Sequence, residues 1–320
     1  MNGQEAVDRI ERAAGRHPGF RRLHARGRVF AGTFEASGAL TGRTTAAHLA
    51  GGRTDVLVRF SNGMPDPAAD DRRPEIRGMA VRFVVDGKAA HDLVAASVRV
   101  FPSRGPEGFL ELVELRRAAG GRLDALLALP RLGRFLARHP ESVGALRDAL
   151  SQRTPASFAT TRYDGLHAFL LVGADGARTP FRYRLAPELG EATLSKEEAR
   201  GRDRHFLVPE LHARLADGPV RFRLELQLAR PGDRTDDPSK RWPDDREVVV
   251  AGVVSVTGEA PDADALEREV FDPTRVPDGV ELSHDPVLRL RPEAYAVSAE
   301  RRLAERDQAP APGGSTRVRP

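Results

Sequence analysis

Eight short segments of this 320-residue chain alternate between apolar and polar side chains, and this pattern constrains the fold most. They lie at residues 27–36, 54–61, 77–85, 92–101, 166–172, 178–184, 219–228 and 247–256. In the clearest, 219–228, the even-numbered residues from Val220 to Leu228 are apolar and the odd-numbered residues between them are polar. Such alternation is typical of antiparallel strands with one buried face. Because eight strands suffice to close a barrel, we expect an α+β fold, a closed antiparallel eight-stranded β-barrel with surrounding helices.

The segments between the strands predict where the helices lie. Residues 4–15 have the apolar spacing of an amphipathic helix. Residues 106–150 are helical in character, and we expect Pro130 and Pro140 to break them into pieces. The segment 308–320 is rich in proline and glycine and is expected to be a disordered tail. Residues 1–307 are therefore expected to form a single domain.

Composition excludes several classes of protein. The net charge is +4, and the basic residues, nearly all arginine, are spread among 46 acidic ones without a long block, which argues against nucleic-acid binding. No run of eighteen apolar residues and no apolar signal segment are present, so we expect a cytoplasmic protein that does not bind a membrane. The chain has no cysteine, so any redox chemistry needs a bound cofactor without cysteine ligands.

A phenol and an arginine lie four residues apart near the C-terminus. Asp285 and Pro286 predict a helix start, with a capping carboxylate and a proline at the first helical position. Arg291 and Tyr295 then share one face of the helix. Keeping a free phenol as phenolate at neutral pH costs about 4 kcal/mol, and a guanidinium and a ferric ion both reduce that cost. The pair can therefore hold an iron, although the same spacing is also typical of an ordinary stacked surface pair.

Further motifs occur in a fixed order along the chain. Near the N-terminus, Arg21, His24, Ala25 and Gly27 follow the spacing Arg, two residues, His-Ala, one residue, Gly. The others are Val58 to Ser61, Arg77 to Phe83, Asp92 to Val94, and Phe271-Asp272-Pro273 continuing to Tyr295. With the Arg291–Tyr295 pair, this series spans roughly residues 15–305 and resembles the haem catalases. Because the chain ends soon afterwards, it is most similar to their minimal branch, the catalase-related peroxidases.

The resemblance implies a catalase-type barrel that binds haem b, with Tyr295 as the iron ligand. It implies that His24 takes a proton from the peroxide and returns it to the leaving oxygen, and that Ser61 holds the imidazole. Without its flanking motif, His24 would be interpreted as a turn histidine.

The remaining site residues also follow from the resemblance. Arg21, Arg59 and Arg302 match the arginines that neutralise the haem propionates. His167 matches a strand histidine that supports Arg291 and Tyr295, and Phe101 matches an aromatic side chain of the distal pocket. The alternatives are a strand histidine that only forms hydrogen bonds, and a plain core phenylalanine.

Two departures from the family pattern bear on function. Ala96 stands where catalases have the distal asparagine, so catalase activity is expected to be weak. Ser97 could replace that amide only in part, because it points to the opposite face of a regular strand. Pro292 is expected to kink the helix and to disturb the spacing of Arg291 and Tyr295.

The expected function is a haem peroxidase that reduces organic hydroperoxides or hydrogen peroxide and oxidises a small organic donor. One alternative is a haem-binding sensor or carrier that has lost turnover. Another is an enzyme that rearranges a bound lipid hydroperoxide. The expected partners are a peroxide and a reductant, and a homo-oligomer is possible.

Overall fold

The computed structural model describes residues 1–118 and 122–308, and ten strands form one sheet in it. The strands are β1 (Gly27–Ala36), β2 (Arg53–Asn62), β3 (Arg77–Val85), β4 (Lys88–Ala96), β5 (Tyr163–Asp164), β6 (Phe169–Val172), β7 (Arg178–Pro187), β8 (Val220–Leu228), β9 (Val248–Glu259) and β10 (Val280–Leu282). Of the predicted tail, Gln308 ends the last helix, and residues 309–320 lie outside the described residues.

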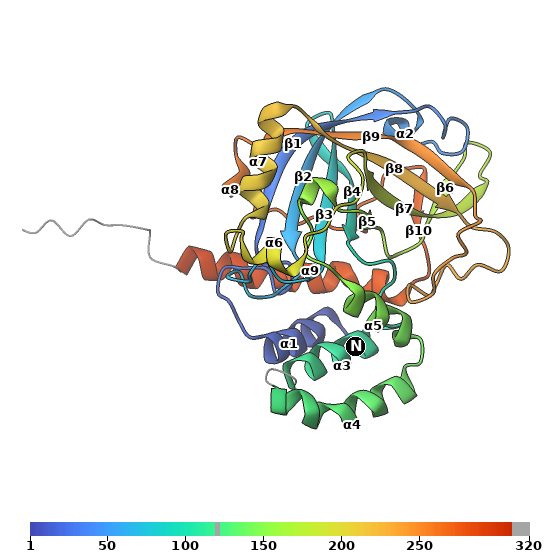
Figure 1. Cartoon of the computed structure of the whole chain (residues 1–320). Helices are drawn as coiled ribbons and strands as arrows, with labels where there is room; N and C mark the ends of the chain where they lie inside the picture. The colour runs from blue at the N-terminus through green and yellow to red at the C-terminus, as the bar shows by residue number, and fades with distance from the viewer. Residues whose placement is uncertain (119–121, 309–320) are drawn as a thin grey trace, which may run out of the picture.

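The sheet closes on itself (Figure 1). Its strand order is β10-β6-β7-β5-β4-β3-β2-β1-β9-β8, and a further antiparallel pairing joins β7 to β8. The closed ring therefore consists of β1, β2, β3, β4, β5, β7, β8 and β9, while β6 and β10 extend from the first half of β7. The predicted closed antiparallel eight-stranded barrel is confirmed.

Two of the predicted strands differ from the observed ones. The segment 92–101 leaves the sheet after Ala96, because the chain turns and the Phe101 N–H donates to the Pro238 carbonyl at 3.0 Å. Of the segment 166–172, only Phe169–Val172 is a strand, and it lies outside the closed ring. The ring uses β5 instead, which at two residues is too short to produce an alternating pattern.

The barrel interior holds the apolar face of each strand. On β8, the predicted apolar residues from Val220 to Leu228 are all buried in one large core cluster. Phe60 on β2 and Met79 on β3 belong to the same cluster. Burying side chains of this size stabilises the fold by about 1.5–3 kcal/mol each. Since alternate residues face opposite sides, Arg59 and Ser61 of β2 lie on the outer face.

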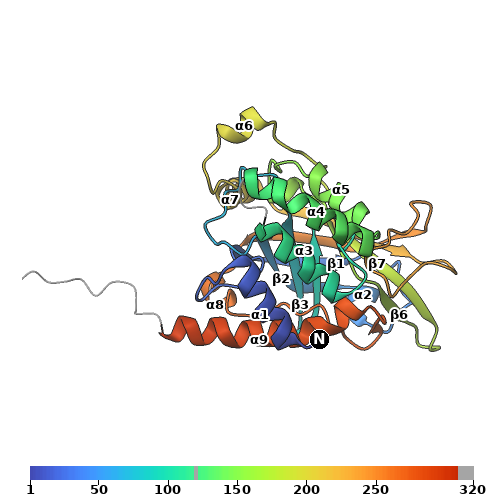
Figure 2. The ribbon, with the colours of Figure 1, turned by 90° about the horizontal axis from the view of Figure 1, so that it is seen from below.

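The helices lie around the barrel and at one end of it (Figure 1). They are α1 (Gly3–Ala14), α2 (Ala47–Ala50), α3 (Pro106–Ala118), α4 (Arg122–Arg138), α5 (Ser142–Ser151), α6 (Lys196–Arg200), α7 (Leu207–Asp217), α8 (Ala263–Leu266) and α9 (Pro286–Gln308), with a 3₁₀ turn at Phe158–Thr160. The long α9 runs beneath the barrel with α1 packed along it, and α3 and α4 lie beyond α1 (Figures 1 and 2). Among the described residues, no helix is both long and apolar enough to cross a membrane.

Of the two predicted helix breaks, the one at Pro130 is wrong and the one at Pro140 is confirmed. Pro130 lies inside α4, where it is exposed. Pro292 lies inside α9, and the helix continues on both sides of it. Pro140 does separate α4 from α5.

Candidate functional site

The outer face of β2, β3 and β4 has a row of three small residues. Ser61 pairs with Gly78, and Gly78 pairs with Ala96. Residues directly opposite each other in antiparallel strands point to the same side of the sheet. This side is the outer one, because the neighbouring Phe60 and Met79 belong to the core. Ala96 therefore lies in the same row as Ser61.

His24 lies over this row. Its ring Nδ1 is 3.0 Å from Ser61 Oγ. A Cβ at Gly78 would lie 2.6 Å from that nitrogen and 2.7 Å from the Ser61 oxygen, so only glycine leaves room for the contact. The backbone of His24 has a φ of 52°, which is uncommon for a residue with a side chain. Arg59 Nη2 donates to the His24 carbonyl at 3.1 Å and helps to hold this conformation.

The imidazole of His24 is neutral at physiological pH. Burial, together with the positive charges of Arg59, Arg291 and Arg21, lowers the pKa of His24 from 6.5 to about 3. A neutral imidazole has one N–H donor and one acceptor nitrogen. In the tautomer that can act as a base, Nδ1–H donates to Ser61 and the lone pair is on Nε2.

Three arginines gather at the residues that follow α8. Arg59 binds the Glu267 carboxylate through two contacts of 2.9 and 3.0 Å, and Arg21 binds it at 2.7 Å. Arg302 Nη1 donates to the Glu267 carbonyl at 2.7 Å. Burial and the charge of Arg59 lower the pKa of Arg21 well below its usual value. The cluster of Arg21, Arg59 and Arg302 has one carboxylate bound to it, and this leaves an excess of positive charge.

The second half of the site lies at the start of α9. Asp285 Oδ1 accepts the backbone N–H groups of Val287 at 2.8 Å and Leu288 at 3.2 Å, so it caps the helix. Arg291 Nε donates to Tyr295 Oη at 3.1 Å, and Nη2 donates to the same oxygen. The kink expected at Pro292 therefore does not separate this pair. The helix remains regular enough for the i,i+4 contact.

Tyr295 differs from the other two tyrosines of the chain. Tyr163 and Tyr183 are buried in the barrel core, where their hydroxyl groups donate to the carbonyls of Phe158 and Val94. Burial raises the pKa of both phenols, which keeps them protonated. Of the three tyrosines, Tyr295 alone accepts hydrogen bonds from a guanidinium.

Two predicted site residues lie in places that the sequence did not predict. His167 is in the connection between β5 and β6 rather than on a strand, and its Nδ1 is 2.6 Å from Asp285 Oδ2, not against Arg291. Its Nε2 is buried and has no hydrogen-bond partner among the described residues. Phe101 follows the end of β4, and its ring centre is 5.9 Å from that of His167. Phe101 does not belong to the barrel core cluster, and its ring centre also lies 5.0 Å from that of Phe109.

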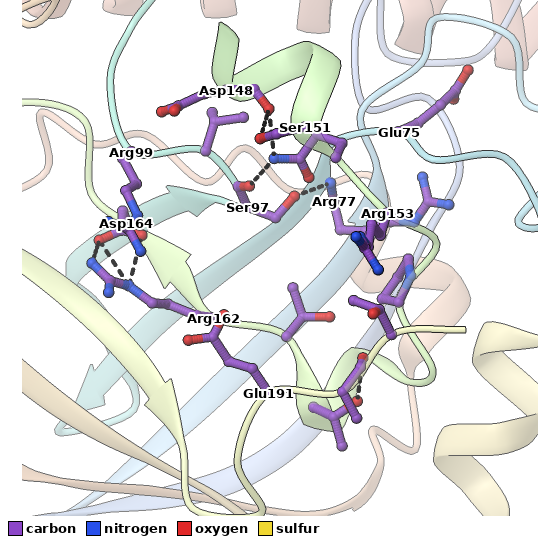
Figure 3. Close-up of a pocket in the computed structure, with 17 residues that line it drawn as sticks. Glu75, Arg77, Ser97, Arg99, Asp148, Ser151, Arg153, Arg162, Asp164 and Glu191 are labelled. Carbon is purple, nitrogen blue, oxygen red and sulfur yellow. Dashed lines mark hydrogen bonds and ion pairs between the residues drawn. The ribbon is translucent and has the colours of Figure 1, made fainter. Parts of the chain in front are cut away.

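A cavity of about 280 Å³ opens away from these residues, beside the end of β4 and α5 (Figure 3). None of the predicted site residues is among the described residues that line it. Ser97 does line it, and its Oγ accepts the Arg77 backbone N–H at 2.9 Å while Gln152 donates to its carbonyl at 3.0 Å. Ser97 therefore forms its hydrogen bonds at this cavity. It does not replace the asparagine amide that catalases have at the position of Ala96.

The structure adds two residues that the sequence analysis missed. Gly78 lies within a motif that was recognised, and a glycine in a strand is a known sign of close approach by another group. No sequence pattern indicated Glu267, because it is separated from Arg59 by 208 residues and only the fold brings the two together.

The residues present fit a haem. Tyr295, with its two hydrogen bonds from Arg291, has the chemistry of an anionic iron ligand. The excess positive charge at Arg21, Arg59 and Arg302 suits the two carboxylates of a haem. The charges of Arg291, Arg59 and Arg21 all act on the buried His24.

Comparison with known proteins agrees with this arrangement. The family model described as catalase matches residues 5–310. A catalase-related peroxidase from Mycolicibacterium paratuberculosis is 43% identical over 98% of both chains, and one from Synechococcus elongatus is 29% identical over 93% of this chain and 88% of its own. A crystal structure of a fungal catalase has a TM-score of 0.78 at 21% identity, covers 93% of this chain, and is matched over 62% of its own length. The chain belongs to the catalase family.

Proposed function

We propose that the protein is a haem b peroxidase that reduces organic hydroperoxides or hydrogen peroxide, oxidises a small organic donor, and has weak catalase activity. The catalase family implies a haem cofactor and an oxidoreductase that acts on peroxide. The observation that supports the proposal most is the neutral His24, held by Ser61 at 3.0 Å on a row that ends in Ala96.

His24 moves the proton. Its Nε2 takes a proton from the hydroperoxide oxygen that stays at the site and returns it to the oxygen that leaves, so the O–O bond breaks to release an alcohol or water. Ser61 keeps the ring oriented during both transfers. In the net reaction, ROOH and a donor DH₂ give ROH, water and D, so the two electrons and two protons come from the donor.

Other residues bind the cofactor. Tyr295 would be the iron ligand, with Arg291 stabilising its phenolate oxygen, and Arg21, Arg59 and Arg302 would hold the propionates. When bound, the haem would supply the redox centre that passes the donor's electrons to the hydroperoxide, because the side chains of the site contain none. His167 would support the start of α9 through Asp285, and Phe101 would pack beside His167.

Ala96 favours peroxidase over catalase chemistry. A catalase must orient a second hydrogen peroxide and oxidise it, and a fixed amide donor assists that step. Removing one preorganised donor typically costs about 10²–10³ in rate. An external organic donor does not need this amide, because it only has to deliver electrons.

The test is an absorption spectrum of the purified protein, followed by addition of a hydroperoxide with and without a phenolic donor. We expect a high-spin ferric haem and donor-dependent consumption of the hydroperoxide that exceeds oxygen evolution from hydrogen peroxide. Haem binding without consumption would instead indicate a sensor or carrier. Consumption that needs no donor would indicate rearrangement of the hydroperoxide.

A further inference from the structure

Among the residues that the structure describes, Glu267 is the one carboxylate bound to the cluster of Arg21, Arg59 and Arg302. Its two oxygens bind Arg59 at 2.9 and 3.0 Å, and one of them also binds Arg21 at 2.7 Å. Its backbone carbonyl accepts from Arg302 at 2.7 Å. A single residue therefore contacts all three guanidinium groups, although they come from the N-terminal loop, β2 and α9.

The contacts around Glu267 leave donors for a further anion. Arg21 Nη2 binds the carbonyl of Glu269 at 2.7 Å, and Arg302 Nη2 binds that of Arg268 at 2.7 Å. A guanidinium has five N–H groups, so each of these arginines keeps unused donors. Burial by itself would raise the pKa of Glu267, but the charges of Arg59 and Arg21 outweigh it and hold the pKa below its usual value. The carboxylate is thus ionised at neutral pH, and each arginine is held in one orientation.

Arg59 connects this cluster to the acid–base residue. The same Nη2 that binds Glu267 Oε2 at 3.0 Å also donates to the His24 carbonyl at 3.1 Å. The backbone of His24 has a φ of 52°, a conformation that needs support from its neighbours. A change at Glu267 can therefore reach His24 through one side chain.

We infer that Glu267 is a positioning residue that orients Arg21 and Arg59 toward the two carboxylates of the haem and, through Arg59, holds the backbone of His24. The inference rests on the proposed function, because it needs haem as the ligand. The direction in which haem binding changes when Glu267 is removed distinguishes positioning from an effect of charge alone. If Glu267 acted only by its charge, removing it would strengthen the binding of an anionic cofactor. If it positions the arginines, removing it weakens that binding.

The experiment compares Glu267→Gln with the wild type, each loaded with haem or with haem dimethyl ester, whose carboxylates are blocked. Haem loss is followed by transfer to apomyoglobin, and thermal unfolding of each apoprotein is recorded as a check on folding. We expect haem to leave Glu267→Gln on the order of tenfold faster than the wild type. The diester should leave both proteins at rates within about a factor of two, because it offers the arginines no carboxylate.

Glu269→Gln is the matched control, because the Glu269 side chain is half exposed and pairs with Arg82 instead of the cluster. We expect it to retain haem as the wild type does. The inference is overturned if Glu267→Gln retains haem longer than the wild type. It is also overturned if this variant loses haem and the diester faster than the wild type by the same factor. Glu267→Asp, whose shorter arm keeps the charge but not the reach, should lose haem faster as well. Failure of the wild type to bind haem would contradict the proposed function itself.

Discussion

The two halves of the candidate site are built in different ways. On the α9 side, Arg291 and Tyr295 are four residues apart on one helix, and Asp285 caps the same helix. On the barrel side, His24 comes from a loop, and Ser61, Gly78 and Ala96 come from three strands. The α9 half depends on the spacing of residues along one helix. The barrel half depends on strand register, so a one-residue shift in strand pairing would separate only the residues of the barrel half.

We expect the two halves to differ in role, with the α9 half binding haem and the barrel half acting in catalysis. The α9 half offers a phenol oxygen that accepts from a guanidinium, and the Arg291–Tyr295 contact is present although a proline lies within the helix. The barrel half offers a neutral base in an uncommon backbone conformation with no room for a Cβ at Gly78. We therefore expect substitutions in the α9 half to change haem content and those in the barrel half to change rates.

The largest effect is expected at Tyr295. Tyr295→Phe removes the only tyrosine oxygen that accepts from a guanidinium, so the protein should lose haem or its phenolate-type spectrum, measured by absorption after reconstitution. Tyr183→Phe is the control, because its hydroxyl binds the backbone of Val94 within the barrel. An unchanged spectrum in Tyr295→Phe, with a disrupted one in a folded Tyr183→Phe, would mean that the α9 half is assigned to the wrong residue.

The next largest effect is expected at His24. His24→Ala removes the base and should lower hydroperoxide turnover by about 10²–10⁴-fold, while haem content stays near that of the wild type. Ser61→Ala keeps the base but loses its orienting contact, so a smaller loss of roughly tenfold is expected. Steady-state kinetics and haem content, measured on the same samples, test whether turnover falls while haem binding is kept. Unchanged turnover in His24→Ala would show that the barrel half has no role in catalysis.

A gain of function is expected at Ala96. Ala96→Asn places an amide in the row with Ser61 and Gly78 and should raise oxygen evolution from hydrogen peroxide by up to about 10²–10³-fold, which is what one donor typically contributes. Ser97→Asn places the same amide next to the separate cavity and should not raise it. An oxygen electrode measures both. Equal gains in the two variants would show that the strand register does not control this activity.

The smallest effect is expected from pH. The pKa of His24 is lowered to about 3, so the base form is present above that value and is lost only as the pH falls through it. The rate of hydroperoxide consumption should change by less than about twofold between pH 7 and pH 5, whereas a histidine with a pKa of 6.5 would lose roughly thirtyfold. Stopped-flow mixing after a short pH jump measures this. A steep fall near pH 6.5 would contradict a buried, neutral His24.

The sequence predicted most of the elements that matter for the site. The alternation of β8, the cap at Asp285 and the Arg291–Tyr295 spacing all depend on residues close together in the chain, and the structure shows each of them. The short strand β5 was missed because two residues produce no period. Pro130 was predicted to break its helix, and Pro292 to disturb the Arg291–Tyr295 spacing, because the rule for proline does not include the rest of the helix.

By itself, the sequence determined the barrel class and the helix that presents Tyr295, and its resemblance to the catalases supplied the residues that we propose act on peroxide and haem. Only the tertiary structure decided that His24 lies over the row of Ser61, Gly78 and Ala96, that Ser97 lines a separate cavity, that His167 binds Asp285, and that Glu267 contacts the arginine cluster. The physical reason is the distance along the chain. Local periodicity fixes which face a residue occupies, but contacts across more than a hundred residues depend on how the barrel closes.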